Sequence, residues 1–312
     1  MKRFYCALLL AVIQVACLPC RNGTADEQAQ CLANLPKEDV MQHPQVAHFL
    51  SRNKVYVSLT TSPSRIERVA TTLKSLNLDL IDTIFVSLPE KFRDKETYTI
   101  PDALRNSPKV RIMQGGSDLG PIMKLLPTVL EVRRLGQPDA IVITIDDDVG
   151  YSADVLGQLL KHAVLYNAPA GGKGMNIDFW DIRSELWPER LVRSPACYSG
   201  YDVTYCDALE GYGAVAYPVR LIDVDLLKSL TLTSKACKTA DDIVISYGLA
   251  KRGVPKILVG KLPFFGSIMP FDHGFGEDAL HRGSGFLGSA ASGDTNAERY
   301  RTCVDSMDAH KR

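Results

Sequence analysis

The sequence predicts an α/β protein built on a mostly parallel sheet with helices on both sides. From residue 54 onward, apolar runs rich in β-branched residues alternate with segments of helical periodicity. The run 140–145 is apolar apart from one threonine, which is typical of a strand covered on both faces. With 312 residues, 46% of them hydrophobic, the chain can form one large domain with a substantial core.

The expected elements follow one another in regular order. Strands are predicted at 54–61 (KVYVSLTT), 83–89 (TIFVSLP), 109–114 (KVRIMQ) and 140–145 (AIVITI). Helices are predicted at 64–76, 120–136, 155–164 and 239–253. Ser64 and Glu67 form a capping box for the first helix, and Pro127 kinks the second or delays its start.

The N-terminus has the pattern of a secretory leader. A basic MKR precedes an apolar run of about fifteen residues, and a polar segment follows. We expect a signal peptide over 1–20 or, alternatively, a short signal anchor, although a bilayer span needs ~20 residues. Residues 21–52 are expected to form a polar stem. This predicts the secretory pathway: a secreted or lumenal protein (Golgi or ER in a eukaryote, periplasmic or exported in a bacterium), with membrane contact only through the anchor.

The overall charge and the cysteine spacing give no support for a nucleic-acid partner, an acidic membrane surface or a zinc site. Basic and acidic side chains number 36 each, so nothing in the overall charge favours nucleic acid or an acidic membrane surface. None of the 8 cysteines shows the spacing of zinc ligands. In an oxidising compartment, the easiest disulfide to expect joins Cys197 and Cys206.

Three adjacent carboxylates, Asp146, Asp147 and Asp148, follow the fourth strand directly. One interpretation is a solvated turn that caps the next helix. The other is a metal site, because ligands of open α/β sheets bind at the carboxyl ends of strands and hard divalent cations take oxygen ligands. In that case Asp146 and Asp148 face the ion, and the Asp147 side chain points elsewhere.

A second acidic pair opens the helix in TADDIVISYGLAKRGV. Thr239 and Asp242 fit a capping box, which places Asp241 and Asp242 in the first helical turn. Acidic residues there interact favourably with the helix dipole, by roughly 0.3–1 kcal/mol each. Alternatively, one of the two carboxylates serves as a general base toward a hydroxyl.

Two further segments allow a structural and a functional interpretation. In LEGYGAVAYP, Gly211 and Gly213 form a tight turn into a strand, or let the backbone approach a ligand while Tyr212 stacks on a sugar or base. In SDLGPIMKLL, Lys124 is either a solvated surface lysine or a point charge facing a phosphate.

The order of IDDDV, the glycine–aromatic segment and ADDIVISYGLAKRG resembles the metal-dependent, nucleotide-sugar-using glycosyltransferases of the GT-A fold, over residues 54–261. The resemblance implies a mixed, mostly parallel sheet flanked by helices. It implies Mn²⁺ or Mg²⁺ bound by Asp146 and Asp148 against the donor diphosphate. It also implies that Asp242, or Asp241 as second choice, deprotonates the acceptor.

The same resemblance extends to other positions. His281 is the candidate for a further metal ligand, with His273 weaker. Further residues are expected to contact the donor nucleotide or its diphosphate: Thr60, Arg65, Lys124, Asp146, Asp147, Gly211 and Tyr212. A catalytic domain is expected over 53–265, with the tail 266–312 completing the active site. The region around Trp180 and Trp187 is expected to close over the donor and exclude water.

The expected function is transfer of one sugar from a nucleotide-diphosphate sugar to a hydroxyl of a glycan, glycoprotein or glycolipid, dependent on a divalent metal and with inversion. The Gln-x-x-Arg-Trp signature of processive synthases is missing, which favours single transfer. One alternative is a secreted, metal-independent glycoside hydrolase, which needs two separated carboxylates. The other is a non-catalytic carbohydrate-binding protein of the same fold.

Overall fold

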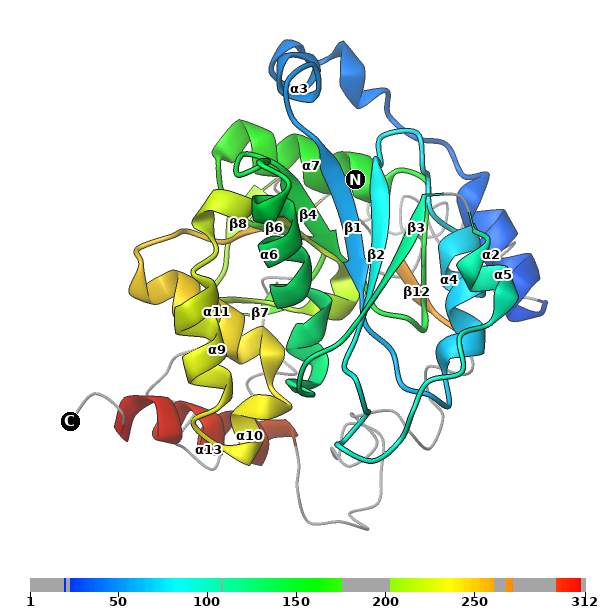
Figure 1. Ribbon diagram of the computed structural model, residues 1–312. Helices are drawn as coiled ribbons and strands as arrows, with labels where there is room; N and C mark the ends of the chain where they lie inside the picture. The colour runs from blue at the N-terminus through cyan, green and yellow to red at the C-terminus, as the bar shows by residue number, and fades with distance from the viewer. Residues whose placement is uncertain are drawn as a thin grey trace, which may run out of the picture.

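The computed structural model of the protein describes residues 20, 23–107, 109–175, 203–260, 268–271 and 296–309. Its centre is an eight-stranded sheet in the order β3-β2-β1-β4-β10-β6-β11-β8 (Figure 1). The strands are β1 Val55–Leu59, β2 Thr83–Leu88, β3 Val110–Gln114, β4 Ile141–Thr144, β6 Ala170–Gly171, β8 Val203–Tyr205, β10 Val215–Pro218 and β11 Ile257–Val259. Two small sheets pair β5 (Val149–Tyr151) with β12 (Ile268–Pro270) and β7 (Gly174–Met175) with β9 (Ala208–Leu209).

The sheet is mixed, with its first four strands parallel. β1 pairs in parallel with both β2 and β4, and β3 continues the parallel order beyond β2. β10 then runs antiparallel between β4 and β6. The chain therefore moves outward from β1 to β3 and returns to the other side of β1 at β4. A strand order that reverses between β1 and β4 opens a crevice at their carboxyl ends, where α/β proteins bind ligands.

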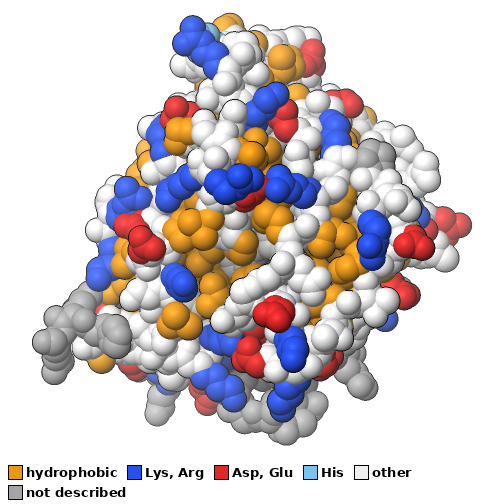
Figure 2. Space-filling view, viewed as in Figure 1, with side chains coloured by type: hydrophobic (Ala, Val, Ile, Leu, Met, Phe, Trp, Pro, Cys, Tyr) orange, Lys and Arg blue, Asp and Glu red, His pale blue; other side chains and the backbone are white. Residues whose placement is uncertain are grey.

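Helices cover both faces of this sheet, as the alternation of strands and helices in the sequence predicted. Every residue of β1 and β4 is buried. Alternate residues face different layers: Val57 packs with α4 and α7, while Tyr56 packs with α6 and α11. The helices are α4 Val69–Lys74, α5 Asp102–Arg105, α6 Leu126–Arg134, α7 Val155–Tyr166, α9 Val224–Thr231, α10 Lys235–Lys238 and α11 Asp241–Lys251. On the face in Figure 2, basic and acidic side chains are interspersed around apolar ones.

Two of the predicted helices begin later than expected, because a 3₁₀ turn precedes each of them. Pro127 delays its helix: a 3₁₀ segment, η3 (Gly120–Lys124), comes first, and Pro127 occupies the first turn of α6. Before α4 lies another 3₁₀ turn, η2 (Ile66–Arg68). The capping box predicted for Ser64 and Glu67 is wrong, because no side chain caps this start and the Ser64 hydroxyl instead lies 3.0 Å from that of Ser62.

The segment expected to be a stem is folded onto the domain. It contains α2 (Ala25–Ala33), η1 (Val40–Gln42) and α3 (Pro44–Leu50). α2 packs against α4 and β5 and buries Leu32, and α3 packs against α7 and buries Val46. A disulfide joins Cys20 to Cys31. The apolar residues of α2 and α3 therefore belong to the domain core.

A second disulfide joins Cys237 of α10 to Cys303 of the C-terminal helix α13 (Asn296–Ala309) and so fixes α13 beside α10 and α11. Cys206 is buried, with its Sγ 3.9 Å from the Lys256 carbonyl oxygen, and Cys197, its expected disulfide partner, lies outside the described residues. Within the described part of the chain, no helix is both long and apolar enough to cross a membrane, and residues 1–19 lie outside that part.

Glycine at position 120 is expected to be required for the fold. Gly120 has φ +76°, and a Cβ there would lie 2.1 Å from the Lys238 carbonyl oxygen. Gly136 has φ +73° with open space around it. Gly136→Ala should therefore cost only the backbone strain, about 1–2 kcal/mol. Gly120→Ala should cost about 3 kcal/mol or more, because α10 and η3 must also separate. Urea unfolding of both variants checks this, and equal losses would contradict the close approach.

Candidate active site

Two acidic motifs that are far apart in the sequence meet at the carboxyl ends of β1 and β4. Asp146–Asp148 follow β4, and Asp241 and Asp242 lie in the first turn of α11. Three other segments complete the cluster: Thr61 and Arg65 after β1, Lys124 at the end of η3, and the turn η6 (Gly211–Gly213) before β10. The cluster therefore lies at the carboxyl ends of the strands where the strand order reverses, which is where α/β proteins bind ligands.

Lys124 connects the two motifs. Its Nζ lies 2.8 Å from Asp146 Oδ1 and 3.0 Å from Asp241 Oδ2, and its side chain is only 7% exposed. Burial lowers the pKa of Lys124, but the carboxylates of Asp146, Asp241 and Asp242 outweigh burial and raise that pKa well above its usual value. Lys124 is therefore a charged, buried lysine. Its interpretation as a solvated surface residue is wrong.

Arg65 neutralises the other two members of the triplet. Its Nη2 contacts Asp147 Oδ1 and lies 2.6 Å from Asp148 Oδ2. Thr61 Oγ1 also donates to Asp147 Oδ2 at 2.5 Å, and Thr72 Oγ1 donates to the Asp147 carbonyl at 2.8 Å. The triplet is thus a partly buried, cross-linked loop, and its interpretation as a solvated helix cap is wrong.

The three carboxylates of the triplet have different partners. Asp147 and Asp148 share Arg65, while Asp146 pairs with Lys124. That Asp146 and Asp148 face one ion, with Asp147 turned away, stays a prediction. Burial raises the pKa of Asp147. Burial and the neighbouring Asp147 charge raise the pKa of Asp148 to about 7, against the opposing effect of Arg65.

Asp242 is directed at the glycine turn. The Gly211 N–H donates to Asp242 Oδ1 at 2.9 Å. The predicted capping box is wrong, because α11 starts after Ala240 without a side-chain cap and Thr239 Oγ1 donates back to the Ala236 carbonyl. Burial and the adjacent Asp241 raise the pKa of Asp242 well above its usual value. A half-buried carboxylate with a raised pKa has the basicity that a general base needs.

The predicted close approach at Gly211 is present, but toward protein groups. A Cβ at this position would lie 2.5 Å from Lys124 Nζ and 3.0 Å from Asp242 Oδ1. The Tyr212 ring, expected to stack on a sugar or base, lies under Lys173 Nζ, 4.2 Å from the ring centroid. Thr60 is partly exposed directly after β1.

Several residues of this site carried no sequence signal. The Tyr151 hydroxyl accepts from the Asp146 N–H at 3.0 Å and donates to the Tyr212 carbonyl at 3.2 Å, which ties the triplet to the η6 turn. Lys173 Nζ donates to the Tyr212 hydroxyl at 2.7 Å and lies 3.5 Å from Glu210. Thr61 was within reach of sequence analysis, since it stands beside Thr60 in the segment TTSPSRI.

The carboxylate oxygens of this site suit a hard divalent cation. A bound ligand would fill the remaining coordination positions of that cation. The Asp146 and Asp148 side chains are 29% and 13% exposed, so they reach the crevice. Within the described ranges, no three His, Cys, Asp or Glu side chains are grouped to hold a metal, and His281, His273, Trp180 and Trp187 lie outside those ranges. Carboxylates outnumber cations in the cluster, and Mg²⁺ sites commonly use one or two carboxylates plus substrate phosphates. Asp146 and Asp148 fit that description.

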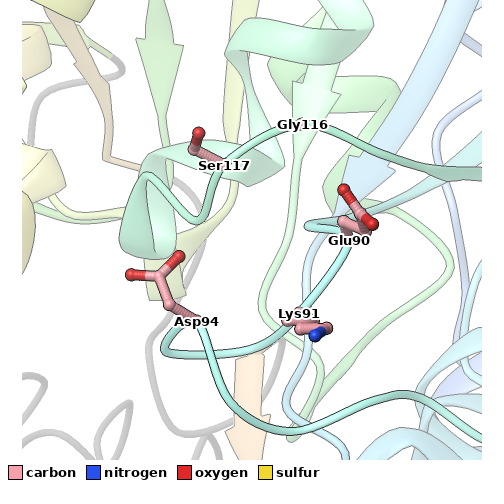
Figure 3. Close-up of a pocket in the computed structure, with 5 residues that line it drawn as sticks. All are labelled: Glu90, Lys91, Asp94, Gly116 and Ser117. Carbon is pink, nitrogen blue, oxygen red and sulfur yellow. The ribbon is translucent and has the colours of Figure 1, made fainter.

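A polar cavity of about 350 Å³ lies at the same edge of the sheet (Figure 3). Its lining comes from the loops after β2 and β3, namely Glu90, Lys91, Asp94, Gly116 and Ser117. The Tyr98 hydroxyl donates to the Thr61 carbonyl at 2.9 Å and thereby joins the chain after the β2 loop to the acidic cluster. The volume is within the range of small-molecule sites.

Comparison with known proteins gives distant structural likenesses. No family model and no curated protein matches the sequence. One similar solved structure is GalNAc-T7 with UDP, GalNAc and Mn²⁺: 11% identity, TM-score 0.39, covering 67% of this chain and 42% of that one. Another is the galactosyltransferase LgtC in complex with donor and acceptor sugar analogs: 12% identity, TM-score 0.34, covering 63% of this chain and 70% of that one. The chain thus spans less than half the length of the GalNAc-T7 chain.

Removal of Arg65 should destabilise the fold in a pH-dependent way. Arg65→Met leaves the buried Asp147 and the partly buried Asp148 without their cation, which should cost about 3 kcal/mol near neutral pH. A carboxylate whose pKa is raised in the folded protein lowers the free energy of unfolding at pH values above that raised pKa. This loss disappears as the pH falls toward the pKa of the unfolded chain, about 4. The loss should therefore shrink between about pH 8 and pH 5.

Urea unfolding at several pH values measures this loss of stability. Arg68→Met, at an exposed position, is the control and should stay within about 0.5 kcal/mol of wild type. A loss independent of pH would contradict this account.

Proposed function

We propose that the protein is a glycosyltransferase that moves one sugar from a nucleotide-diphosphate sugar to an acceptor hydroxyl, with a divalent cation. The observation that carries the proposal is the convergence of Asp146–Asp148 and Asp241–Asp242 on one crevice at the carboxyl ends of β1 and β4. One motif offers carboxylates for a metal–diphosphate group. The other offers a carboxylate of raised pKa for a hydroxyl.

The reaction needs positive charge beside the departing diphosphate and a base beside the acceptor hydroxyl. The bond from this carbon to the diphosphate oxygen breaks, and its electron pair stays on the diphosphate. Asp146 and Asp148 would hold a Mn²⁺ or Mg²⁺ ion, which would supply Lewis-acid stabilisation of that leaving group. Arg65, beside Asp148, adds positive charge at the same edge. The acceptor oxygen forms the new bond, and its proton passes to Asp242.

The base is assigned to Asp242 because the two acidic residues have different partners. Asp241 is buried and paired with Lys124, whereas Asp242 is half-buried and held by one backbone N–H. A base that activates the acceptor opposite the leaving group implies inversion at the anomeric carbon. The acceptor class is a glycan, glycoprotein or glycolipid.

The alternative of a metal-independent glycoside hydrolase fits the cluster less well. Such enzymes place a sugar between two separated carboxyl groups. Here the Lys124 ammonium occupies the space between Asp146 and Asp241. A non-catalytic binding protein would have no need for so many partly buried carboxylates.

We place the protein in the secretory pathway, secreted or lumenal. The Cys20–Cys31 and Cys237–Cys303 disulfides support an oxidising compartment. The N-terminal apolar segment serves as a signal peptide or an anchor. Since Cys20 is bonded to Cys31, a cleaved leader would end before Cys20 rather than at position 20.

Nucleotide binding should require both metal and Asp148. Calorimetric titration with a panel of nucleoside diphosphates and nucleotide sugars should show binding with Mn²⁺ and little with EDTA. Asp148→Asn should weaken the Mn²⁺-dependent binding at least about tenfold, because it removes a carboxylate ligand. Asp139→Asn, at the opposite end of β4 and 65% exposed, should leave affinity unchanged. The proposal fails if folded wild-type protein binds no nucleotide, or binds it equally well in EDTA.

Removal of the base should affect turnover and not donor binding. Asp242→Asn should lower kcat by about 10²–10⁴-fold, while nucleotide affinity stays within about threefold of wild type. The acid limb of the wild-type kcat/KM profile should lie above the ordinary aspartate pKa of 3.8, because the raised pKa delays deprotonation. Asp225→Asn, an exposed acidic residue in the first turn of α9, should behave as wild type. Retention of kcat in Asp242→Asn would assign the base elsewhere.

A further inference from the structure

We propose that Lys124 is a positioning residue, not a phosphate ligand: it holds Asp146 and Asp241 in one buried ion cluster and leaves Asp242 as the reactive carboxylate. This inference deepens the proposed function and depends on it. It starts from the distances of 2.8 Å and 3.0 Å from Lys124 Nζ to Asp146 Oδ1 and Asp241 Oδ2.

Lys124 is enclosed on several sides. Gly211 lies over the ammonium so closely that a single added carbon would be 2.5 Å from Nζ and 3.1 Å from Cε. The segment that carries Lys124, η3, packs against β1, β2, α10 and α11. A phosphate oxygen at Nζ would have to displace the η6 turn or a paired carboxylate. The Arg65 side chain, which is 16% exposed, is more accessible to a ligand than the Lys124 side chain, which is 7% exposed.

The charge of the cluster also opposes a direct role toward phosphate. Lys124, Asp146 and Asp241 together carry one more negative than positive charge. A phosphate oxygen at Nζ would therefore meet two carboxylates beside the ammonium, and these three groups together would not attract it. The same pairing fixes the Asp146 oxygen that faces Lys124 and orients its other oxygen, which is the arrangement that a metal ligand requires.

The pairing separates two adjacent carboxylates. Asp241 points to Lys124 and Asp242 points to the Gly211 N–H, although both lie in the first turn of α11. Asp241 therefore acts through Lys124 on Asp146. Only Asp242 remains for the acceptor proton.

The ion cluster is tested in ligand-free protein by urea unfolding of Lys124→Met, Asp241→Asn and the double variant. Asp241→Asn should lower the urea midpoint in the wild-type background, because it breaks the pair. In the Lys124→Met background the same change should raise the midpoint, because it removes a buried carboxylate that lacks its cation. Asp225→Asn should shift the midpoint equally in both backgrounds. An equal shift by Asp241→Asn in both backgrounds overturns the inference.

The positioning role is tested by how the loss divides between kcat and KM. Lys124→Met should raise the Mn²⁺ concentration needed for half-maximal activity at least about tenfold and lower kcat, while at saturating Mn²⁺ the donor KM and the nucleoside diphosphate affinity stay within about threefold. A tenfold rise in donor KM with kcat retained would make Lys124 a phosphate ligand and overturn the inference.

Asp241→Asn in the wild-type background provides the test if Lys124→Met does not fold. It should lose less than about tenfold in kcat, against at least 10²-fold for Asp242→Asn. Equal losses in the two variants would overturn the separation of roles. Absence of nucleotide binding by wild type would overturn the proposed function, whereas the urea shifts report on the ion cluster alone, so the two failures are distinguishable.

Discussion

The buried ammonium of Lys124 is the interaction on which the rest of the site depends. It joins η3, the loop after β4 and the first turn of α11, and a buried charge holds its partners because leaving them unpaired is costly. Two glycines make this arrangement possible. Gly120 lets η3 approach α10, and Gly211 leaves space for the ammonium. The backbone around Lys124 is therefore fixed by sterics as well as by charge.

Much of the framework could be predicted from the sequence because its signals are local. The strands predicted at 54–61, 83–89 and 140–145 are mostly apolar, and the structure buries β1, β2 and β4 almost completely, whereas β3, which carries Arg111 and Gln114, is partly exposed. Acidic residues directly after a strand or at a helix start are also visible locally, and the resemblance to GT-A glycosyltransferases then implied the roles of Asp146 and Asp242. The sheet order then places them together, since both lie at the same edge.

The partners of these residues could not be predicted, because tertiary contacts override local patterns. Both expected capping boxes were wrong: the Asp242 carboxylate accepts from Gly211, and no side chain caps the start at Ile66. Disulfide connectivity is equally non-local, since Cys237 and Cys303 are separated by 66 residues. Tyr151 resembles an ordinary core tyrosine in sequence, yet its hydroxyl links the triplet to Tyr212.

The cluster is an excess of carboxylates held in place by Lys124 and Arg65, and a divalent cation would offset part of that negative charge. The most direct test is anomalous diffraction from crystals grown with Mn²⁺ and the tightest-binding nucleoside diphosphate. The account predicts a manganese peak bounded by Asp146 and Asp148, with Lys124 still paired to Asp241. A manganese peak away from both aspartates, or Lys124 bound to the diphosphate, would contradict it.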